Sequence, residues 1–258
     1  MKIAICQSEI KYLDFEHNIK YAENAIYEAA QNNADCIVFP EMSFTGFSMD
    51  TCITSQYGNI SVEMIKNYAQ KSNITVGFGW VEMCEDNLSK NHYSFIAPNR
   101  SVILDYVKIH PFSYAKENLY FKGGTSLPNA SLNNLNFQCM ICYDLRFPEL
   151  FRINVENIHA AFIPANWPDK RIIHWNALLK ARAIENQIYI IGVNCTGNQN
   201  GLTYSGESAI IAPDGSTVCC CKRKAGIYYA DIDTENVIKT RQNFPVLNDI
   251  RKELYKTL

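Results

Sequence analysis

The sequence has no marked excess of either charge and no long apolar run. Among its 258 residues, 24 Lys and Arg stand against 26 Asp and Glu, a formal net charge of −2. This balance provides no electrostatic reason to expect nucleic acid or an anionic membrane as a partner. No apolar run approaches the roughly 20 residues that span a bilayer. We therefore expect neither a nucleic-acid-binding protein nor a membrane protein.

The sequence also shows neither the features of a secretion signal nor those of a disulfide framework. The ten cysteines have no regular spacing, and residues 1–5 have the pattern of a strand instead of a charged segment followed by an apolar one. We therefore expect reduced thiols in a cytoplasmic protein. The C-x-x-C pair of Cys139 and Cys142 has no second pair to complete a zinc site, so no metal is predicted. The cysteines at 219–221 lie in a β-rich stretch, where alternating exposure on a strand accounts for them.

No segment rich in Gly, Pro or Ser divides the chain. Hydrophobic residues make up 47% and charged residues 19%, which is an ordinary composition for a globular protein. The sequence therefore predicts a single domain over residues 1–258, in which about 240–258 form a C-terminal extension.

Helical and strand patterns alternate along the chain. Apolar residues at helical spacing predict helices at 16–32, 61–72 and 170–186. Apolar runs predict strands at 36–40, 74–81, 160–164 and 188–193. Hairpins are expected around the turns at 98–100 and 213–215, and a long polar loop over 109–134.

The two halves of the chain are similar to each other. Residues 95–101 (FIAPNRS) resemble 210–216 (IIAPDGS), and residues 38–40 (VFP) resemble 162–164 (FIP). Each half has the order strand, helix, strand, hairpin. Two facing sheets with helices on the outside satisfy this order. We therefore predict an α/β fold, a four-layer αββα sandwich with an internal pseudo-twofold.

The segment 137–149 contains a candidate nucleophile. An apolar run ends at Cys142, and an amphipathic run begins near Pro148, which the first turn of a helix tolerates. This order predicts a strand, a sharp turn and a helix, with Cys142 on the turn, as in a nucleophile elbow. Unpaired helix N–H groups beside the thiol favour the thiolate and can hold an oxyanion. The alternative is that Cys142 is a small buried residue at a strand end.

Glu41 and Lys108 also stand where strands end. Ligands collect at the carboxyl ends of strands in open α/β sheets, so these side chains can meet Cys142 in space. A Cys nucleophile needs a base, which suits Glu41, and Lys108 is suited to stabilise a tetrahedral intermediate. The ordinary alternatives are a helix cap or loop carboxylate for Glu41 and an exposed strand end for Lys108.

Three motifs together resemble those of the nitrilase, or carbon–nitrogen hydrolase, superfamily: Phe-Pro-Glu-Met at 39–42, Tyr-x-Lys-x-His-Pro-Phe at 106–112 and Cys-Tyr-Asp-Leu-Arg-Phe-Pro-Glu at 142–149. The resemblance covers residues 1 to about 244. It implies a catalytic triad of Glu41, Lys108 and Cys142, with Glu117 as a second glutamate near the site. It also implies a nitrilase-like αββα sandwich, no cofactor, and a homodimer or higher homo-oligomer.

Further segments resemble one branch of the superfamily. Tyr143 follows the cysteine where nitrile-hydrolysing members carry Trp. Residues 166–168, 174–175 and 181–187 resemble the omega-amidase branch, which hydrolyses the side-chain amide of 2-oxoglutaramate or 2-oxosuccinamate. The resemblance implies a small-molecule amide substrate, cleaved to acid and ammonia through a thioester on Cys142. The alternatives are another linear amide, such as a deaminated peptide or an acyl-amino amide, acyl transfer to an amine, and a non-catalytic scaffold.

A 2-oxo acid carries a carboxylate, which needs a cation or other donors. Arg146, one helical turn after Cys142, is the first candidate, and its alternative is a structural ion pair. Three other cations compete with it: Lys122, Arg171 and Arg182.

The remaining candidates surround the reacting group. The Tyr143 N–H is expected to hold the oxyanion together with Lys108. Aromatic side chains are candidates for the walls of the cavity: Phe44, Phe112, Tyr143 and Trp167. Their alternative is an ordinary place in the core.

Overall fold

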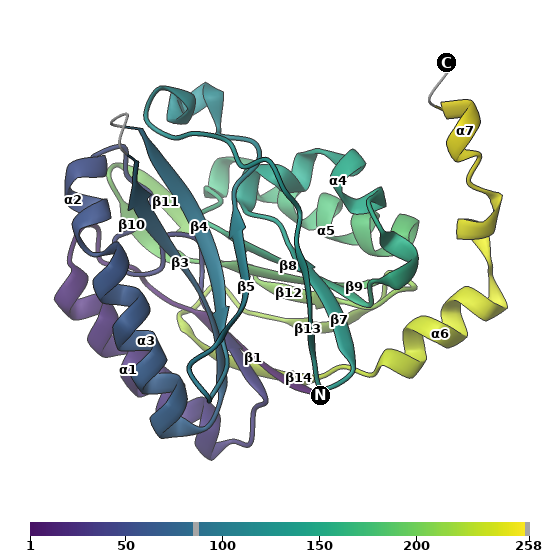
Figure 1. The fold of residues 1–258 in the computed structure, drawn as a ribbon, viewed down its shortest axis with the longest axis horizontal. Coiled ribbons are helices and arrows are strands. Elements are labelled where there is room, and N and C mark those ends of the chain that lie inside the picture. Colours follow the sequence, from purple (N-terminus) through teal and green to yellow (C-terminus); the bar gives the residue numbers. More distant parts are fainter. Residues whose placement is uncertain (85–87, 256–258) are drawn as a thin grey trace.

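The computed structural model describes residues 1–84 and 88–255, which form two facing six-stranded sheets with helices on their outer sides (Figure 1). The first sheet has the order β14-β1-β2-β3-β4-β5 and the second the order β13-β12-β9-β8-β7-β6. The strands of the first are β1 (Lys2–Gln7), β2 (Cys36–Val38), β3 (Thr75–Met83), β4 (Ser89–Ile96), β5 (Val102–Val107) and β14 (Gly226–Asp231). Those of the second are β6 (Asn129–Leu132), β7 (Leu135–Cys139), β8 (Ala160–Ala165), β9 (Tyr189–Asn194), β12 (Ala209–Ile211) and β13 (Thr217–Cys220).

The helices divide between the two outer faces, as Figure 1 shows. The first sheet is covered by α1 (Phe15–Gln31) and α3 (Gly58–Ser72), and the second by α4 (Pro148–Arg152) and α5 (Ile172–Asn186). In α1 the apolar residues at helical spacing are all buried, and Asp14 caps the helix by accepting the His17 N–H. The amphipathic pattern therefore places this helix with its apolar stripe on the sheet.

The three largest clusters of the core define the four layers. One cluster of buried side chains lies between the sheets, and one lies between each sheet and its helices. Between the sheets, the ring of Phe95 lies 4.9 Å from Phe137 and 5.0 Å from Phe162. The prediction of an αββα sandwich is confirmed.

The two sheets also share one connectivity. In each, three parallel strands (β1, β2, β3 and β7, β8, β9) are followed by an antiparallel hairpin (β4–β5 and β12–β13), and one antiparallel strand closes the other edge (β14 and β6). The similar segments at 95–101 and 210–216 form the same turn. Ala97 and Ala212 each accept a hydrogen bond three residues on, from Arg100 and Gly215. The predicted internal pseudo-twofold is therefore present.

Several elements of the structure were not predicted from the sequence. These are α2 (Thr51–Gln56), the edge strands β6 and β14, and the hairpin of β10 (Thr196–Gln199) and β11 (Leu202–Ser205). The predicted loop at 109–134 contains β6 and two 3-10 turns, Ser113–Ala115 and Glu117–Leu119. Edge strands bury little apolar surface, so they carry a weak pattern.

The C-terminal segment lies outside the sheets (Figure 1) and contains α6 (Thr234–Asn243), a 3-10 turn (Val246–Asp249) and α7 (Lys252–Tyr255). Arg241 attaches α6 by donating to the carbonyls of Val155 and Ile158, each at 2.9 Å. Residues 256–258 of the expected extension lie outside the described residues. Across 1–84 and 88–255, no helix has the length and apolar character to cross a membrane.

Candidate active site

Cys142 lies on a sharp turn between a strand and a helix. Strand β7 ends at Cys139, a 3-10 helix runs over Cys142–Arg146, and α4 follows with Pro148 in its first turn. The φ of Cys142 is 49°, in the left-handed region that side chains with a Cβ rarely adopt. The observed path is thus the predicted strand, turn and helix, with backbone strain at the cysteine.

Asp144 fixes the turn from the inside. Its carboxylate accepts the Ile141 N–H at 3.0 Å, and its own N–H donates to the Ile141 carbonyl at 3.0 Å, so the two bonds bracket Cys142. The same carboxylate accepts the Tyr106 hydroxyl at 2.8 Å and the His110 N–H at 3.0 Å. These donors flank the lysine at the end of β5, so Asp144 holds the cysteine turn against that strand end.

Glu41 follows β2 and is fully buried. Its carboxylate accepts hydrogen bonds from Lys108 Nζ (2.8 Å), Asn91 Nδ2 (2.8 Å) and the Asn166 backbone N–H (3.0 Å). The backbone at Glu41 and Met42 lies against β3 at Gly79, where an added Cβ would be 2.4 Å from the Met42 nitrogen. A glycine is therefore required at this point of β3.

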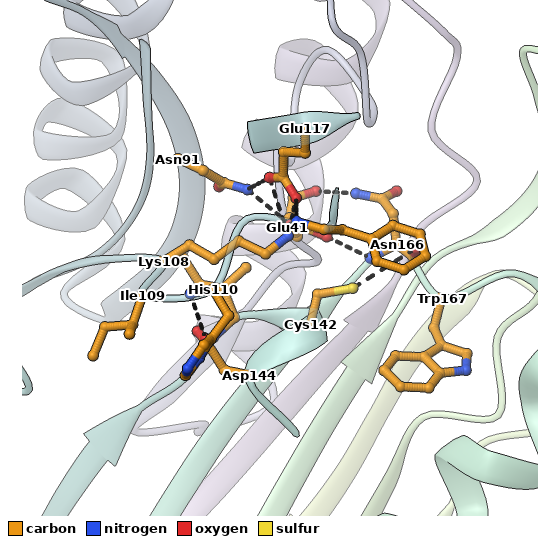
Figure 2. A network of polar contacts seen from close by, with 12 residues as sticks. Glu41, Asn91, Lys108, Ile109, His110, Glu117, Cys142, Asp144, Asn166 and Trp167 are labelled. Atoms are coloured by element: carbon orange, nitrogen blue, oxygen red, sulfur yellow. Dashed lines mark hydrogen bonds and ion pairs between the residues drawn. The ribbon is translucent and has the colours of Figure 1, made fainter. Parts of the chain in front are cut away.

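Lys108 and Glu117 complete the polar group beside the thiol (Figure 2). Lys108 Nζ lies 2.9 Å from Glu117 Oε2 as well as 2.8 Å from Glu41 Oε1, and all three side chains are buried. The Phe112 N–H also donates to Glu117. Asn91 Nδ2 donates to both carboxylates, at 2.8 Å and 3.3 Å. The structure thus brings together Glu41, Lys108, Glu117 and Cys142, as the sequence predicts.

The electrostatics of the thiol differ from the expectation. Burial raises the pKa of Cys142 well above its ordinary value, and the Glu41 and Glu117 carboxylates raise it further, while Lys108 lowers it. The direction of this shift opposes the expectation that the neighbouring helix N–H groups favour the thiolate. The 3-10 helix at Cys142 is short, so its N–H groups do not outweigh burial and two carboxylates.

Lys108 carries its charge between the two acids. Burial lowers the pKa of Lys108, but Glu117 and Glu41 together raise it above the ordinary value of a lysine. Burial also raises the pKa of Glu117, and Glu41 adds to this effect, while Lys108 opposes it. The site therefore holds an ammonium in contact with a carboxylate that takes up a proton more readily than an exposed glutamate.

A small cavity opens beside the thiol. It has a volume of about 60 Å³. Its walls include these residues: Phe47, Lys108, Phe112, Cys142, Tyr143, Arg146, Asn166, Trp167, Arg171, Leu202 and Tyr204. Tyr143, Arg146, Trp167 and Phe112 are thus at the cavity, as expected.

Phe44 is a correction to the expected cavity wall. Its ring packs against Phe39 (6.1 Å between centroids) and Phe78 (5.8 Å), in the core beneath α1 and α3, and it does not line the cavity beside the thiol. Phe47, three residues later, takes that place. The turn after β2 directs Phe44 inwards and Phe47 towards the thiol, a difference that residue type alone does not reveal.

Of the competing cations, Arg171 lines the cavity, whereas Arg182 is occupied elsewhere. Arg182 donates to the Leu145 carbonyl and forms an ion pair with Glu185 at 2.9 Å. Lys122 does not line this cavity. In the described part of the chain, no group of three or more His, Cys, Asp or Glu side chains is arranged to hold a metal ion.

Three polar residues of the site were not predicted from the sequence: Asn91, Asp144 and Asn166. A signal existed for Asn166, because it follows the segment 162–164 that resembles the segment before Glu41. Asn91 lies within β4 and Asp144 within a turn, where a polar residue has many ordinary explanations.

Known proteins are similar to this chain over nearly its full length. The profile of the family described as Carbon-nitrogen hydrolase matches residues 2–242. A 2-oxoglutaramate amidase from Bacillus subtilis (strain 168) is 34% identical over 256 residues, covering 98% of each chain. The omega-amidase YafV of Escherichia coli (strain K12) is 32% identical over 251 residues, covering 96% of each.

Solved structures have the same fold. XC1258 from Xanthomonas campestris, a CN-hydrolase superfamily protein with an arsenic adduct in its active site, has a TM-score of 0.87 at 25% identity and covers 97% of each chain. An amidase from Nesterenkonia sp. has a TM-score of 0.88 at 21% identity over 100% of this chain and 95% of its own, which supports the fold alone. The resemblance to the superfamily and to its omega-amidase branch is thus confirmed. The chain belongs to the carbon–nitrogen hydrolase family.

Proposed function

We propose that this protein hydrolyses the side-chain amide of a small 2-oxo acid, such as 2-oxoglutaramate or 2-oxosuccinamate, to the acid and ammonia. The observation that carries the proposal is the grouping of three residues: Lys108 and Cys142 line one small cavity, and the buried carboxylate of Glu41 contacts Lys108 at 2.8 Å and acts on the thiol. The relatives named 2-oxoglutaramate amidase and omega-amidase support the choice of substrate.

The first half of the reaction forms a thioester. Cys142 Sγ attacks the amide carbonyl carbon while Glu41 takes the thiol proton, which suits a thiol whose pKa is raised by burial. The carbonyl electrons move onto the oxygen, which Lys108 Nζ and the Tyr143 N–H stabilise. Tyr143 lies in the first turn of a 3-10 helix, where N–H groups lack helical acceptors. The intermediate then expels ammonia, which leaves with the proton held by Glu41.

The second half releases the acid. Glu41 takes a proton from a water molecule, whose oxygen attacks the thioester carbon. The C–S bond breaks, and the proton returns to Cys142 Sγ. Glu117 acts as a positioning residue, because it binds Lys108 through two oxygens at 2.9 and 3.1 Å and keeps the ammonium in place.

The surroundings of Arg146 support a role in binding the carboxylate of a 2-oxo acid. It lines the same cavity as Cys142, and its guanidinium lies over the Trp167 ring at 4.7 Å. A guanidinium held on an aromatic face keeps its N–H donors free for a carboxylate. Trp167 thereby orients the cation that selects the substrate.

The test is release of ammonia from a panel of ω-amides by the wild-type protein, by Cys142→Ala and by Cys52→Ala. We expect Cys142→Ala to lose activity by about a thousandfold or more, and exposed Cys52 to be dispensable. Mass spectrometry of protein trapped with substrate should find the acyl group on Cys142. A scaffold would release no ammonia, and an acyltransferase would form hydroxamate from added hydroxylamine in preference to acid. Undiminished turnover by Cys142→Ala would refute the mechanism.

We further propose one domain over residues 1–258, a homodimer or higher homo-oligomer, and a cytoplasmic location. All ten cysteines are free thiols, which supports a reducing compartment. Ile173 and Ile184 of α5 are exposed by 79% and 53%, which supports burial of this helix against a second copy. Light scattering on the purified protein measures the oligomeric state.

A further inference from the structure

The cavity contains a second arginine, Arg171, at the start of α5. It lines the same cavity as Cys142 and Arg146. Its guanidinium lies over two rings, at 5.3 Å from the centroid of Phe112 and 6.0 Å from that of Tyr114. Within the described residues, the side chain is thus held by aromatic faces and not by a carboxylate.

Trp167 connects the two arginines. Its ring carries the guanidinium of Arg146 at 4.7 Å, and its indole N–H donates to the carbonyl of Arg171 at 2.9 Å. Since Trp167 is buried, it holds the Arg146 guanidinium and the Arg171 backbone. Phe112 and Tyr114 hold the Arg171 guanidinium. The two positions are therefore set by packing before any ligand arrives.

Neither guanidinium has an acidic partner within the described residues. The ion pairs of neighbouring arginines, Arg182 with Glu185 and Arg223 with Glu207, do not extend to them. Arg146 contacts a nitrogen of His174 at 3.3 Å, and both burial and the charge of Arg171 lower the pKa of Arg146. Two cations that repel each other in a cavity without a counter-charge favour an anion.

We propose that Arg171, together with Arg146, binds the 2-oxo carboxylate end of the substrate and excludes the corresponding amino acid amide. This rests on the proposed function of Cys142 as the nucleophile. A carboxylate with an adjacent keto oxygen presents only acceptors, which match the planar N–H groups of two arginines. Glutamine carries an ammonium at the same position, which two unpaired guanidinium groups repel. Arg171 is thus a residue that determines specificity for a 2-oxo acid over its amino acid parent.

The kinetic experiment compares Arg171→Met and Arg171→Lys with wild-type protein on three five-carbon amides: 2-oxoglutaramate, glutamine and pentanamide. We expect Arg171→Met to raise KM for 2-oxoglutaramate about tenfold or more, because a charge-assisted pair is lost, with kcat nearly unchanged. Its kcat/KM for neutral pentanamide should stay the same, and its preference for 2-oxoglutaramate over glutamine should fall. Arg171→Lys should be intermediate. Arg100→Met, on the exposed turn between β4 and β5, is the matched control and should behave as wild type.

A binding experiment tests the same site without catalysis. Titration calorimetry with 2-oxoglutarate, the acid product, should show Kd about tenfold or more weaker for Arg171→Met than for wild type. Equal affinity, or an equal loss of kcat/KM on pentanamide and 2-oxoglutaramate, would overturn the role of Arg171. Failure of the proposed function looks different, because then no amide releases ammonia in a Cys142-dependent reaction, while the affinity for 2-oxoglutarate still reports on the two arginines.

Discussion

Asn166 holds Glu41 through two hydrogen bonds. Its backbone N–H donates to Glu41 Oε2 at 3.0 Å, and its Nδ2 donates to the Glu41 carbonyl at 2.6 Å. Asn166 follows β8 of the second sheet and Glu41 follows β2 of the first, so the pair joins the ends of two strands in different sheets. The Asn166 carbonyl also lies 3.9 Å from Cys142 Sγ. One asparagine therefore positions both the carboxylate and the thiol (Figure 2).

Replacing Asn166 by Ala is expected to lower kcat by about ten- to a hundredfold, since a misplaced base loses much of its contribution to proton transfer. The change removes the donor to the Glu41 carbonyl, while the Asn166 backbone donor stays. KM should change little, because the proposed site for the substrate carboxylate is formed by Arg146 and Arg171. Steady-state kinetics with 2-oxoglutaramate measure both constants. Asn24→Ala, on the exposed side of α1, is the control, and an unchanged kcat in Asn166→Ala would contradict the role.

Replacing Asp144 by Asn is expected to destabilise the fold by about 2–4 kcal/mol. The carboxylate accepts the N–H groups of Ile141 and His110 and the Tyr106 hydroxyl. An amide of the same shape turns an NH₂ group towards donors and leaves buried groups unpaired, which costs about 1–3 kcal/mol for each such group. Urea unfolding followed by circular dichroism measures the difference. A loss of under about 0.5 kcal/mol, as at an exposed position, would show that the turn holds without this charge.

The reactivity of Cys142 towards iodoacetamide should rise steeply with pH and stay below that of an ordinary thiol at neutral pH. Burial and the carboxylates of Glu41 and Glu117 raise the thiol pKa, and the thiolate is the reactive form. Glu117→Gln removes one negative charge, so it should lower the thiol pKa and shift the alkylation curve to lower pH. Mass spectrometry of tryptic peptides follows the rate, with exposed Cys52 as the internal reference. A shift of the Cys142 alkylation curve to higher pH in Glu117→Gln would contradict the conclusion that Glu117 raises the thiol pKa.

Gly79→Ala is expected to cost about 1–3 kcal/mol of stability, the usual range for overpacking, and to reduce kcat. The added Cβ would lie 2.4 Å from the Met42 nitrogen and 3.0 Å from the Glu41 carbonyl carbon, so the turn that carries Glu41 must move. Thermal unfolding and kinetics on one preparation measure both effects. Gly226→Ala is the matched control, since the nearest atom to its Cβ would be 3.5 Å away. Equal behaviour of the two variants would show that the turn adjusts freely.

The sequence predicts the layers of this fold well because the buried elements carry a clear pattern. Helix α1 runs over Phe15–Gln31 against an expected 16–32, and β8 over Ala160–Ala165 against 160–164. The hairpin of β10 and β11 was missed because its polar segments TGNQ and LTYS lack the alternation of a strand that covers a core. It nevertheless contributes Leu202 and Tyr204 to the cavity.

The sequence likewise predicts some features of the site and not others. Three motifs in a specific order predict Glu41, Lys108 and Cys142, because the three together resemble the family far more specifically than any one of them does. Phe44 and Phe47 are three residues apart on one turn, and only the backbone path decides which one faces the thiol. The raised pKa of Cys142 was also beyond prediction, because it depends on how deeply the thiol and two carboxylates are buried together.

The stacking of the two sheets has a consequence for how activity is lost during unfolding. The first half of the chain provides Glu41, Lys108 and Glu117, and the second provides Cys142 and Asn166. Between the two sheets, the rings of Phe95 and Phe162 pack with their centroids 5.0 Å apart. A shift of one sheet relative to the other would move Cys142 Sγ away from the Glu41 carboxylate before either sheet unfolds. Turnover is therefore expected to be lost at a lower denaturant concentration than the spectroscopic signal of secondary structure.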